Sequence, residues 1–184
     1  MAEVELPQLH RVGIKHPFAP PLQNLEQSVA TALDLCKHLS KIPIGSEVAI
    51  AVGSRGIAQI DTITRTVVSG LKGWNLKPFI VPAMGSHGGG TAEGQQKVLK
   101  KLGIDERSMG CEIRSSMRTV DYGLVTEGIH CHFDANAAGA AGIVLLNRVK
   151  AHTSFPREIE SGLITLIAVG LGKAEGARSV HRIG

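Results

Sequence analysis

The feature of this sequence that most constrains its fold is a regular alternation of short apolar runs with longer amphipathic segments. Apolar runs typical of buried strands occupy residues 46–54, 77–84 and 141–149. Segments with a helical pattern of apolar residues occupy residues 25–39, 57–74, 91–103 and 157–172. This order predicts an α/β fold in which a mostly parallel sheet is flanked by helices.

Details of the pattern support this interpretation. Ile60, Ile63, Val67 and Leu71 fall on one stripe of a helix, and Thr91 precedes the next helix as an expected N-cap. Aromatic residues make up only 3% of the chain, so the core is built from Ala, Val, Ile and Leu, as is usual where helices cover both faces of a sheet. Two further strand-like runs, 115–125 and 128–134, have turn signals at Gly123 and Gly128.

The chain of 184 residues suits a single α/β domain with a proline-rich, irregular arm over about residues 1–22. Its last residues, "GKAEGARSVHRIG", stop inside a helical pattern. We therefore expect residues 1–184 to be the first domain of a longer, two-domain protein.

Charge and cysteine usage limit the classes of partner. The net charge of +4 is spread along the chain without aromatic interleaving, which disfavours a nucleic-acid surface and favours a small anionic ligand. The longest apolar stretch, "LITLIAVGLG", is about half the length that a membrane span needs. The three cysteines are widely spaced, and the N-terminus has no signal-peptide pattern, so we expect free thiols in a cytoplasmic protein.

The predicted strands end in residues that can carry chemistry. Arg55 follows the first strand, His87 the second, and His152 the third. Because ligands bind beyond the carboxyl ends of parallel strands, these three side chains should converge at one edge of the sheet. A guanidinium can hold a carboxylate or phosphate through two parallel hydrogen bonds, and an imidazole can transfer protons near neutral pH.

Each feature also has a simpler reading. Arg55 and His87 are equally compatible with exposed turns, and His152 with a structural hydrogen bond. His130 and His132 lie two residues apart on a predicted strand, which favours a polar, solvent-facing side of a short strand over a metal-binding pair.

Known phosphate-binding and nucleophile motifs are not matched. The glycine-rich loop "GSHGGG" lacks the Lys-Ser/Thr of a P-loop, and "GLGKAEG" follows a helix where a dinucleotide fingerprint follows a strand. Neither Ser54 nor Ser86 lies in a GxSxG elbow, so hydrolysis with a serine nucleophile is disfavoured.

Four segments together resemble one family: "GSRGI", "VPAMGSHGGGTAEGQ", "NRVKAHTSF" and "IESGLITLIAVGLGKAEGA". They are similar to the amino-terminal, Rossmann-like domain of the nickel-pincer lactate racemases and their 2-hydroxyacid racemase relatives. The resemblance runs from about Val48 to His181 and depends most on the glycine-flanked histidine. It implies that Arg55 holds the substrate carboxylate and that His87 and His152 are the catalytic acid/base pair.

The resemblance also implies a cofactor site. His181 falls on the nickel-binding histidine, and Gly85, Ser86, Gly88 and Thr165 fall at the nucleotide cofactor. In the family a lysine tethers that cofactor, and Thr165 occupies its position here. Since threonine cannot form the same thioamide link, we expect a cofactor held without a covalent bond.

The sequence therefore predicts an isomerase that racemises or epimerises a 2-hydroxy acid by reversible hydride transfer to a nickel-pincer nucleotide. The alternative is a non-catalytic module of the same fold that binds a small anion or a nucleotide. The identity of the hydroxy acid and the oligomeric state stay open.

Overall fold

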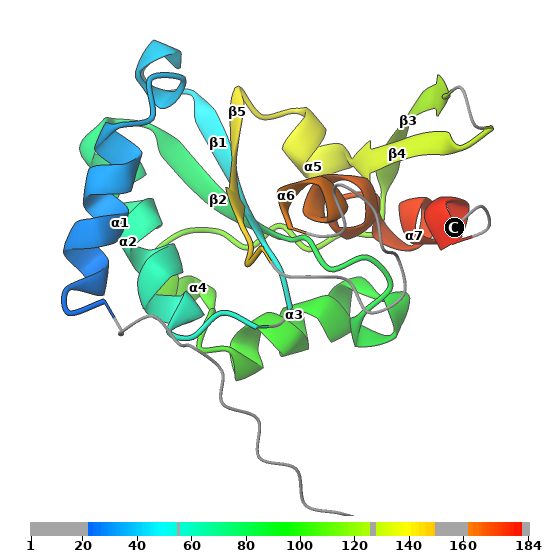
Figure 1. Cartoon of the computed structure of the whole chain (residues 1–184), viewed down its shortest axis with the longest axis horizontal. Helices are drawn as coiled ribbons and strands as arrows, with labels where there is room; N and C mark the ends of the chain where they lie inside the picture. Colours follow the sequence, from blue (N-terminus) through cyan, green and yellow to red (C-terminus); the bar gives the residue numbers. More distant parts are fainter. Residues whose placement is uncertain (1–21, 55, 126–127, 150–161, 182–184) are drawn as a thin grey trace, which may run out of the picture.

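The computed structural model describes residues 22–54, 56–125, 128–149 and 162–181 (Figure 1). Within these ranges the centre is a parallel sheet of three strands, β1 (Glu47–Val52), β2 (Lys77–Pro82) and β5 (Gly142–Leu146), in the order β2-β1-β5. The middle strand is fully buried over residues 48–52, as expected for a continuous apolar run covered on both faces. The prediction of an α/β fold with a parallel sheet flanked by helices is confirmed.

Alternate residues of the strands form two separate cores, because successive side chains of a strand point to opposite faces. Ile50, Val52 and Ile80 belong to the core on the side of the first helices. Ala49 and Ala51 belong to the other core, which includes Leu166 and Leu171 from the C-terminal part of the chain. Small alanine side chains on this second face leave room for the backbone of that C-terminal part to approach the sheet.

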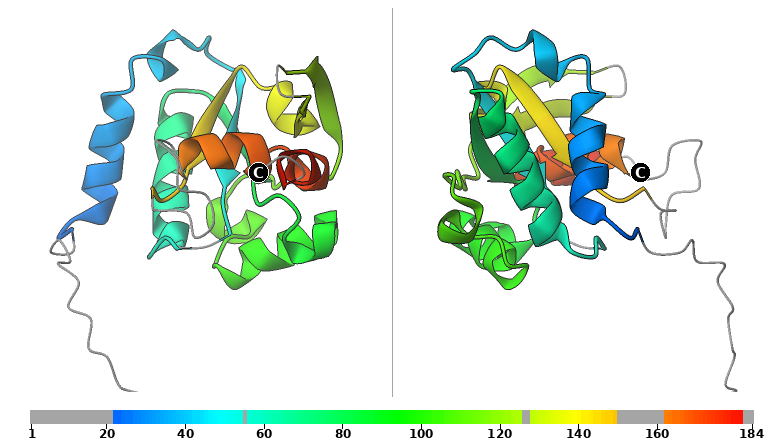
Figure 2. Two further views of the ribbon diagram at one scale, coloured as in Figure 1. Left: turned by 45° about the vertical axis from the view of Figure 1, so that its right-hand side comes forward. Right: turned by 90° about the vertical axis from the view of Figure 1, so that its left-hand side faces the viewer.

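The helices that cover the first face are close to the predicted ones. The predicted ones are α1 (Leu25–Asp34), α2 (Ile60–Gly73) and α3 (Ala92–Lys101), and the short helix α4 (Glu106–Met109) and the 3₁₀ turn η1 (Leu39–Lys41) were not predicted. A second 3₁₀ turn, η2 (Gly88–Gly90), lies in the loop between β2 and α3. α1 and α2 lie side by side (Figures 1 and 2). Thr91 caps α3 as predicted, accepting a hydrogen bond from Gly94 N at 3.0 Å.

A separate antiparallel hairpin follows, formed by β3 (Thr119–Leu124) and β4 (His130–Asp134). Both strands are shorter than the predicted runs. Gly123 lies inside β3 with a φ of 93°, next to an irregularity in the strand pairing, and Gly128 lies in the turn. The one-turn helix α5 (Ala135–Ala138) then leads to β5.

The long helix predicted over residues 157–172 is replaced by broken helical turns where the chain is described. α6 (Leu163–Thr165) continues into the π-helical turn η3 (Leu166–Gly170), and α7 (Lys173–His181) starts after a break. A continuous helix over residues 157–172 would place Leu163, Leu166, Ile167 and Gly170 on one stripe facing the sheet. Leu166 and Gly170 pack toward the sheet, whereas Leu163 and Ile167 are 45% and 40% exposed, so the predicted stripe is not kept across the broken turns.

Three other predictions concern the chain as a whole. The irregular arm predicted for residues 1–22 lies outside the described residues except for Leu22. Cys36, Cys111 and Cys131 are free, as expected. Along the described part of the chain, no helix has both the length and the apolarity needed to cross a bilayer.

Candidate functional site

The carboxyl ends of the three parallel strands bring separate loops together. β1 leads to Ser54, β2 leads to the glycine loop (residues 85–90), and β5 leads to Asn147 and Arg148. Arg148 Nη1 donates to the carbonyl oxygen of Gly56 at 3.2 Å, and Asn147 Nδ2 donates to the carbonyl oxygen of Gly162. The end of β5 thus binds both the loop after β1 and the start of the C-terminal helical turns.

Ser54 and His87 meet at this edge of the sheet. Ser54 Oγ lies 2.6 Å from His87 Nδ1, a hydrogen bond whose donor depends on the tautomer of the imidazole. His87 is exposed, so the ring is held by a neighbouring loop and remains accessible to a ligand. A positioned, accessible imidazole is the arrangement that general acid–base catalysis requires.

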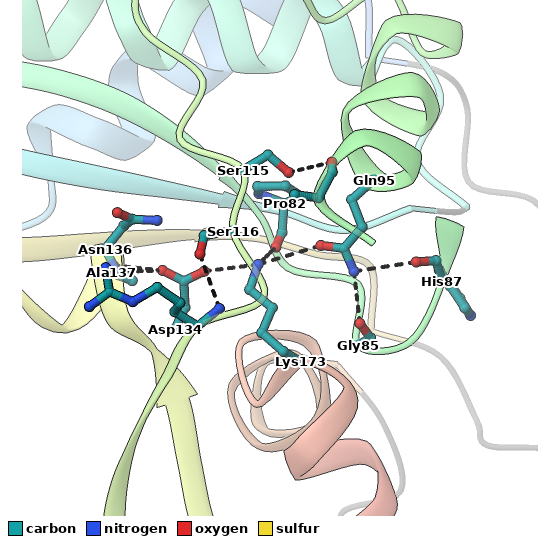
Figure 3. A network of polar contacts seen from close by, with 12 residues as sticks. Pro82, Gly85, His87, Gln95, Ser115, Ser116, Asp134, Asn136, Ala137 and Lys173 are labelled. Atoms are coloured by element: carbon teal, nitrogen blue, oxygen red, sulfur yellow. Dashed lines mark hydrogen bonds and ion pairs between the residues drawn. The ribbon is translucent and has the colours of Figure 1, made fainter. Parts of the chain in front are cut away.

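A buried glutamine holds the glycine loop in place (Figure 3). Gln95 of α3 is fully buried, and its Nε2 donates to the carbonyl oxygens of Gly85 at 2.7 Å and His87 at 3.3 Å. The backbone on both sides of the His87 side chain is therefore fixed by one amide group. We assign Gln95 a positioning role for the loop.

The same network contains a buried ion pair. Lys173, the first residue of α7, and Asp134, the last residue of β4, are both 0% exposed, with Lys173 Nζ 2.8 Å from Asp134 Oδ2. Lys173 Nζ also donates to the carbonyl oxygen of Pro82 and lies 3.5 Å from Gln95 Oε1 (Figure 3). Burial lowers the pKa of Lys173, and the charge of Asp134 opposes that shift.

Asp134 is held by both of its oxygens. Its Oδ1 accepts hydrogen bonds from the backbone N–H groups of Asn136 and Ala137, at 2.8 and 2.9 Å, which caps α5. Its Oδ2 faces the ammonium of Lys173. The ion pair thus connects the hairpin, α7, the end of β2 and, through Gln95, the glycine loop.

Two of the predicted cofactor-binding glycines have packing roles. A Cβ on Gly88 would lie 2.5 Å from the carbonyl carbon of Gly94, and one on Gly85 would lie 3.1 Å from the carbonyl oxygen of Val169. Both residues also have positive φ. Gly89 and Gly90, by contrast, have open space beside them.

A hollow of about 380 Å³ lies between the glycine loop and α7. The residues that line it are Ser86, Gly89, Gly90, Ala174, Ala177 and Arg178. Small residues beside a guanidinium leave room for an anionic group such as a phosphate, which the guanidinium can bind. Arg178 forms an exposed ion pair with Glu175 at 3.0 Å, a contact weak enough for an anion to compete with it.

The other predicted site residues are only partly placed. Arg55 and His152 lie outside the described residues. Thr165 is half-buried at the end of α6, and His181 is the last residue of α7. Ser86 is exposed in the glycine loop, where it lines the hollow beside Arg178.

The roles of Gln95 and Lys173, and the hydrogen bond between Ser54 and His87, were not predicted from the sequence. The single local signal for the buried ion pair was the lysine in the apolar and glycine-rich segment "LIAVGLGKAEG". A lysine in such a segment either pairs with a buried acid or keeps its ammonium at the surface. Its partner Asp134 is distant in the sequence, so the pair itself had no local pattern.

The donor groups of the site fit a covalently tethered cofactor poorly. Thr165 has a hydroxyl where a tether needs an amine, and the amine of Lys173 is buried and paired with Asp134. The hollow beside Arg178 offers donors for a phosphate of a non-covalently held nucleotide.

Comparisons with protein-family models, with curated proteins and with solved structures find no match to this chain.

Proposed function

We propose that this chain is the Rossmann-like amino-terminal domain of a 2-hydroxyacid racemase or epimerase of the nickel-pincer type. The observation that carries the proposal is the accessible imidazole of His87, held by Ser54 at the carboxyl edge of a parallel sheet. Ligands of open α/β sheets bind at this edge.

His87 is the acid/base group in this proposal. Racemisation at C2 of a 2-hydroxy acid removes the hydroxyl proton and a hydride, which leaves a planar keto acid, and then returns both to either face. His87 takes the hydroxyl proton from one enantiomer, and His152 is proposed to serve the other. Ser54 positions the imidazole through its hydrogen bond to Nδ1. Arg55 is proposed to bind the carboxylate of the substrate.

A nickel-pincer nucleotide, when bound, would supply the hydride acceptor of this reaction. The resemblance assigns its metal to His181, and an imidazole is a suitable ligand for nickel. The glycine loop and Arg178 are the groups proposed to contact its phosphate, and no covalent link to Thr165 is proposed.

The test compares His87→Ala with His38→Ala, which removes an exposed histidine outside the site. Each protein is produced together with the enzymes that make the cofactor, and interconversion of the enantiomers of several 2-hydroxy acids is followed by chiral chromatography. We expect His87→Ala to lose at least about 10²-fold in rate, the usual contribution of a general acid–base group, and His38→Ala to retain full activity. Near-normal racemisation by His87→Ala would refute the assignment.

The second candidate function is a non-catalytic module that binds a small anion or a nucleotide. Thr165 and the hollow beside Arg178 favour it, because they provide anion contacts without a tether. Nickel content separates the two functions. Stoichiometric nickel that is lost in His181→Ala supports the racemase, whereas nucleotide binding that needs Arg178 in a nickel-free protein supports the module.

A further inference from the structure

The β3–β4 hairpin carries a cluster of potential metal ligands that the proposed function does not use. Asp121 lies on β3, and His130 and His132 lie on β4. Each of the three residues offers a ligand atom, and these atoms all lie within 4.8 Å of one another. We propose that this cluster is a binding site for a divalent transition-metal ion of the zinc type.

The hairpin geometry explains why the three side chains converge. Asp121 is paired directly with His132 across the two strands, so both side chains point to the same face. His130 shares this face because it lies two residues from His132. The two imidazole rings are stacked, with centroids 6.1 Å apart. The three side chains share a face because of the strand pairing, so a rigid movement of the whole hairpin would keep them together.

The carboxylate is oriented before any ion binds. Asp121 Oδ1 accepts a hydrogen bond from Gly123 N at 2.8 Å, and Oδ2 lies 2.9 Å from His130 Nδ1. The hydrogen bond from Gly123 and the contact with His130 together fix the orientation of the carboxylate. Two ligand atoms at about 2.1 Å from a tetrahedral zinc ion lie roughly 3.4 Å apart, so the pair that is 2.9 Å apart has to open by about half an ångström to hold the ion.

The chemistry of the ligands selects the class of metal. Two imidazoles and one carboxylate suit zinc, copper, nickel or iron, whereas magnesium and calcium require mainly oxygen ligands. A cation at His130 Nδ1 replaces the hydrogen bond to Asp121, and the ring proton is then carried on Nε2. His132 Nδ1 lies 3.4 Å from Thr119 Oγ1, a neighbour that helps to orient the second ring.

The site is open to solvent. The side chains of His130 and Asp121 are 51% and 44% exposed. Three protein ligands therefore leave at least one coordination position for water or for a donor atom of a bound molecule. Cys131 lies between the two histidines but points to the opposite face of the strand, so its thiol is not part of the site.

Zinc binding to untagged, full-length protein tests the proposal. Isothermal titration with zinc chloride is carried out in a His181→Ala background, which removes the metal ligand of the proposed racemase site. We expect one equivalent of zinc to bind through the hairpin and His132→Ala or Asp121→Asn to weaken that binding by at least about 10–100-fold, since even outer-shell changes have effects of that size. Cys131→Ser and His38→Ala are the matched controls and should bind as before.

Thermal melting followed by circular dichroism checks that each variant is folded. Because Asp121 and His130 are exposed and His132 is half-buried, none of them in the core, their substitution should leave the metal-free protein folded. Zinc affinity that is unchanged in His132→Ala, or absence of any binding at millimolar zinc, would overturn the proposal. The outcome does not depend on racemase activity, so either proposal can fail without the other.

Discussion

Lys173 shows how much structure can depend on one side chain. Its ammonium is fully buried among Asp134, Pro82 and Gln95, and its own backbone has a φ of 55°. A buried charge is tolerated only when it is paired and hydrogen-bonded, and breaking the pair leaves an uncompensated charge in the core. The residue is thus important for stability and, through Gln95, for the loop that carries His87.

Two variants test how much this ion pair contributes to the free energy of unfolding. Lys173→Met should lower the free energy of unfolding by about 3–5 kcal/mol, because Asp134 then remains buried without its counter-charge. The double variant Lys173→Met/Asp134→Asn should lose less, since the asparagine oxygen can still cap α5 and no unpaired charge remains. Urea unfolding measures both.

Lys100→Met is the matched control, because Lys100 is exposed on α3, and its effect should stay within about 0.5 kcal/mol. A loss below about 1 kcal/mol for Lys173→Met, or a double variant that is less stable than Lys173→Met alone, would show that the ion pair does not have this role.

At the scale of elements, the glycine loop and α3 form one packed unit. Gly88 and Gly94 are in backbone contact, and Thr91 Oγ1 bonds both the loop and the helix, donating to Gly88 O at 3.2 Å and accepting from Gly94 N. Gln95 binds the other side of the loop. His87 is therefore carried by a loop whose two ends are fixed to a helix, which suits a group that must keep its orientation.

Gly94→Ala tests this packing. A Cβ at this position would lie 1.7 Å from the carbonyl oxygen of Gly88, so the loop would have to move. We expect a loss of about 1–3 kcal/mol or more in the free energy of unfolding. Gly73→Ala, at the end of α2 with nothing within 4 Å, should instead be neutral or stabilising by up to about 1 kcal/mol. If Gly94→Ala and Gly73→Ala changed the free energy of unfolding equally, the close approach of Gly94 to Gly88 would be excluded.

The elements that the sequence predicted best are those with a local cause. The run around β1, the stripe of α2 and the Thr91 cap each depend on neighbouring residues, and all three are present. In the stripe, Ile63 is the exception, because it is only half-buried whereas Thr64 is fully buried. The C-terminal turns were predicted as one helix because their residues are apolar on most sides, and such a pattern does not define a helical phase. Next to the break, Gly170 O accepts a hydrogen bond from Gly85 N of the glycine loop, a contact with a distant part of the chain that no local pattern encodes.

In the candidate site, too, only features with a local cause could be predicted from the sequence. His87 could be placed at the sheet edge from the order of strands alone, because parallel strands end on one side. The partner Ser54 and the supporting Gln95–Lys173–Asp134 network join distant parts of the chain and follow from the packing of three layers. No local pattern could have revealed them.

For the molecule as a whole, the arrangement of groups predicts how the proposed nucleotide cofactor would be retained. The C-terminal turns cross the sheet face lined by Ala49 and Ala51, and this places α7 beside the glycine loop (Figure 2). Anion contacts at Arg178 are available there, whereas Thr165 offers no amine and that of Lys173 is paired. A nucleotide cofactor should therefore be held by metal and phosphate contacts alone.

Intact-mass spectrometry of cofactor-loaded protein tests this form of retention. We expect added mass under native conditions and the mass of the bare sequence after denaturation, because no covalent bond forms. Thr165→Lys is the matched variant: it places an amine at the position where the resemblance to the lactate racemases puts their tether, so an adduct that survives denaturation should appear in it. An adduct that survives denaturation in the unaltered chain would contradict the prediction, and peptide mapping would then show whether Lys150 or Lys173 carries it. Attachment at Lys173 would require its ion pair with Asp134 to open, and the protein would then lose stability on loading.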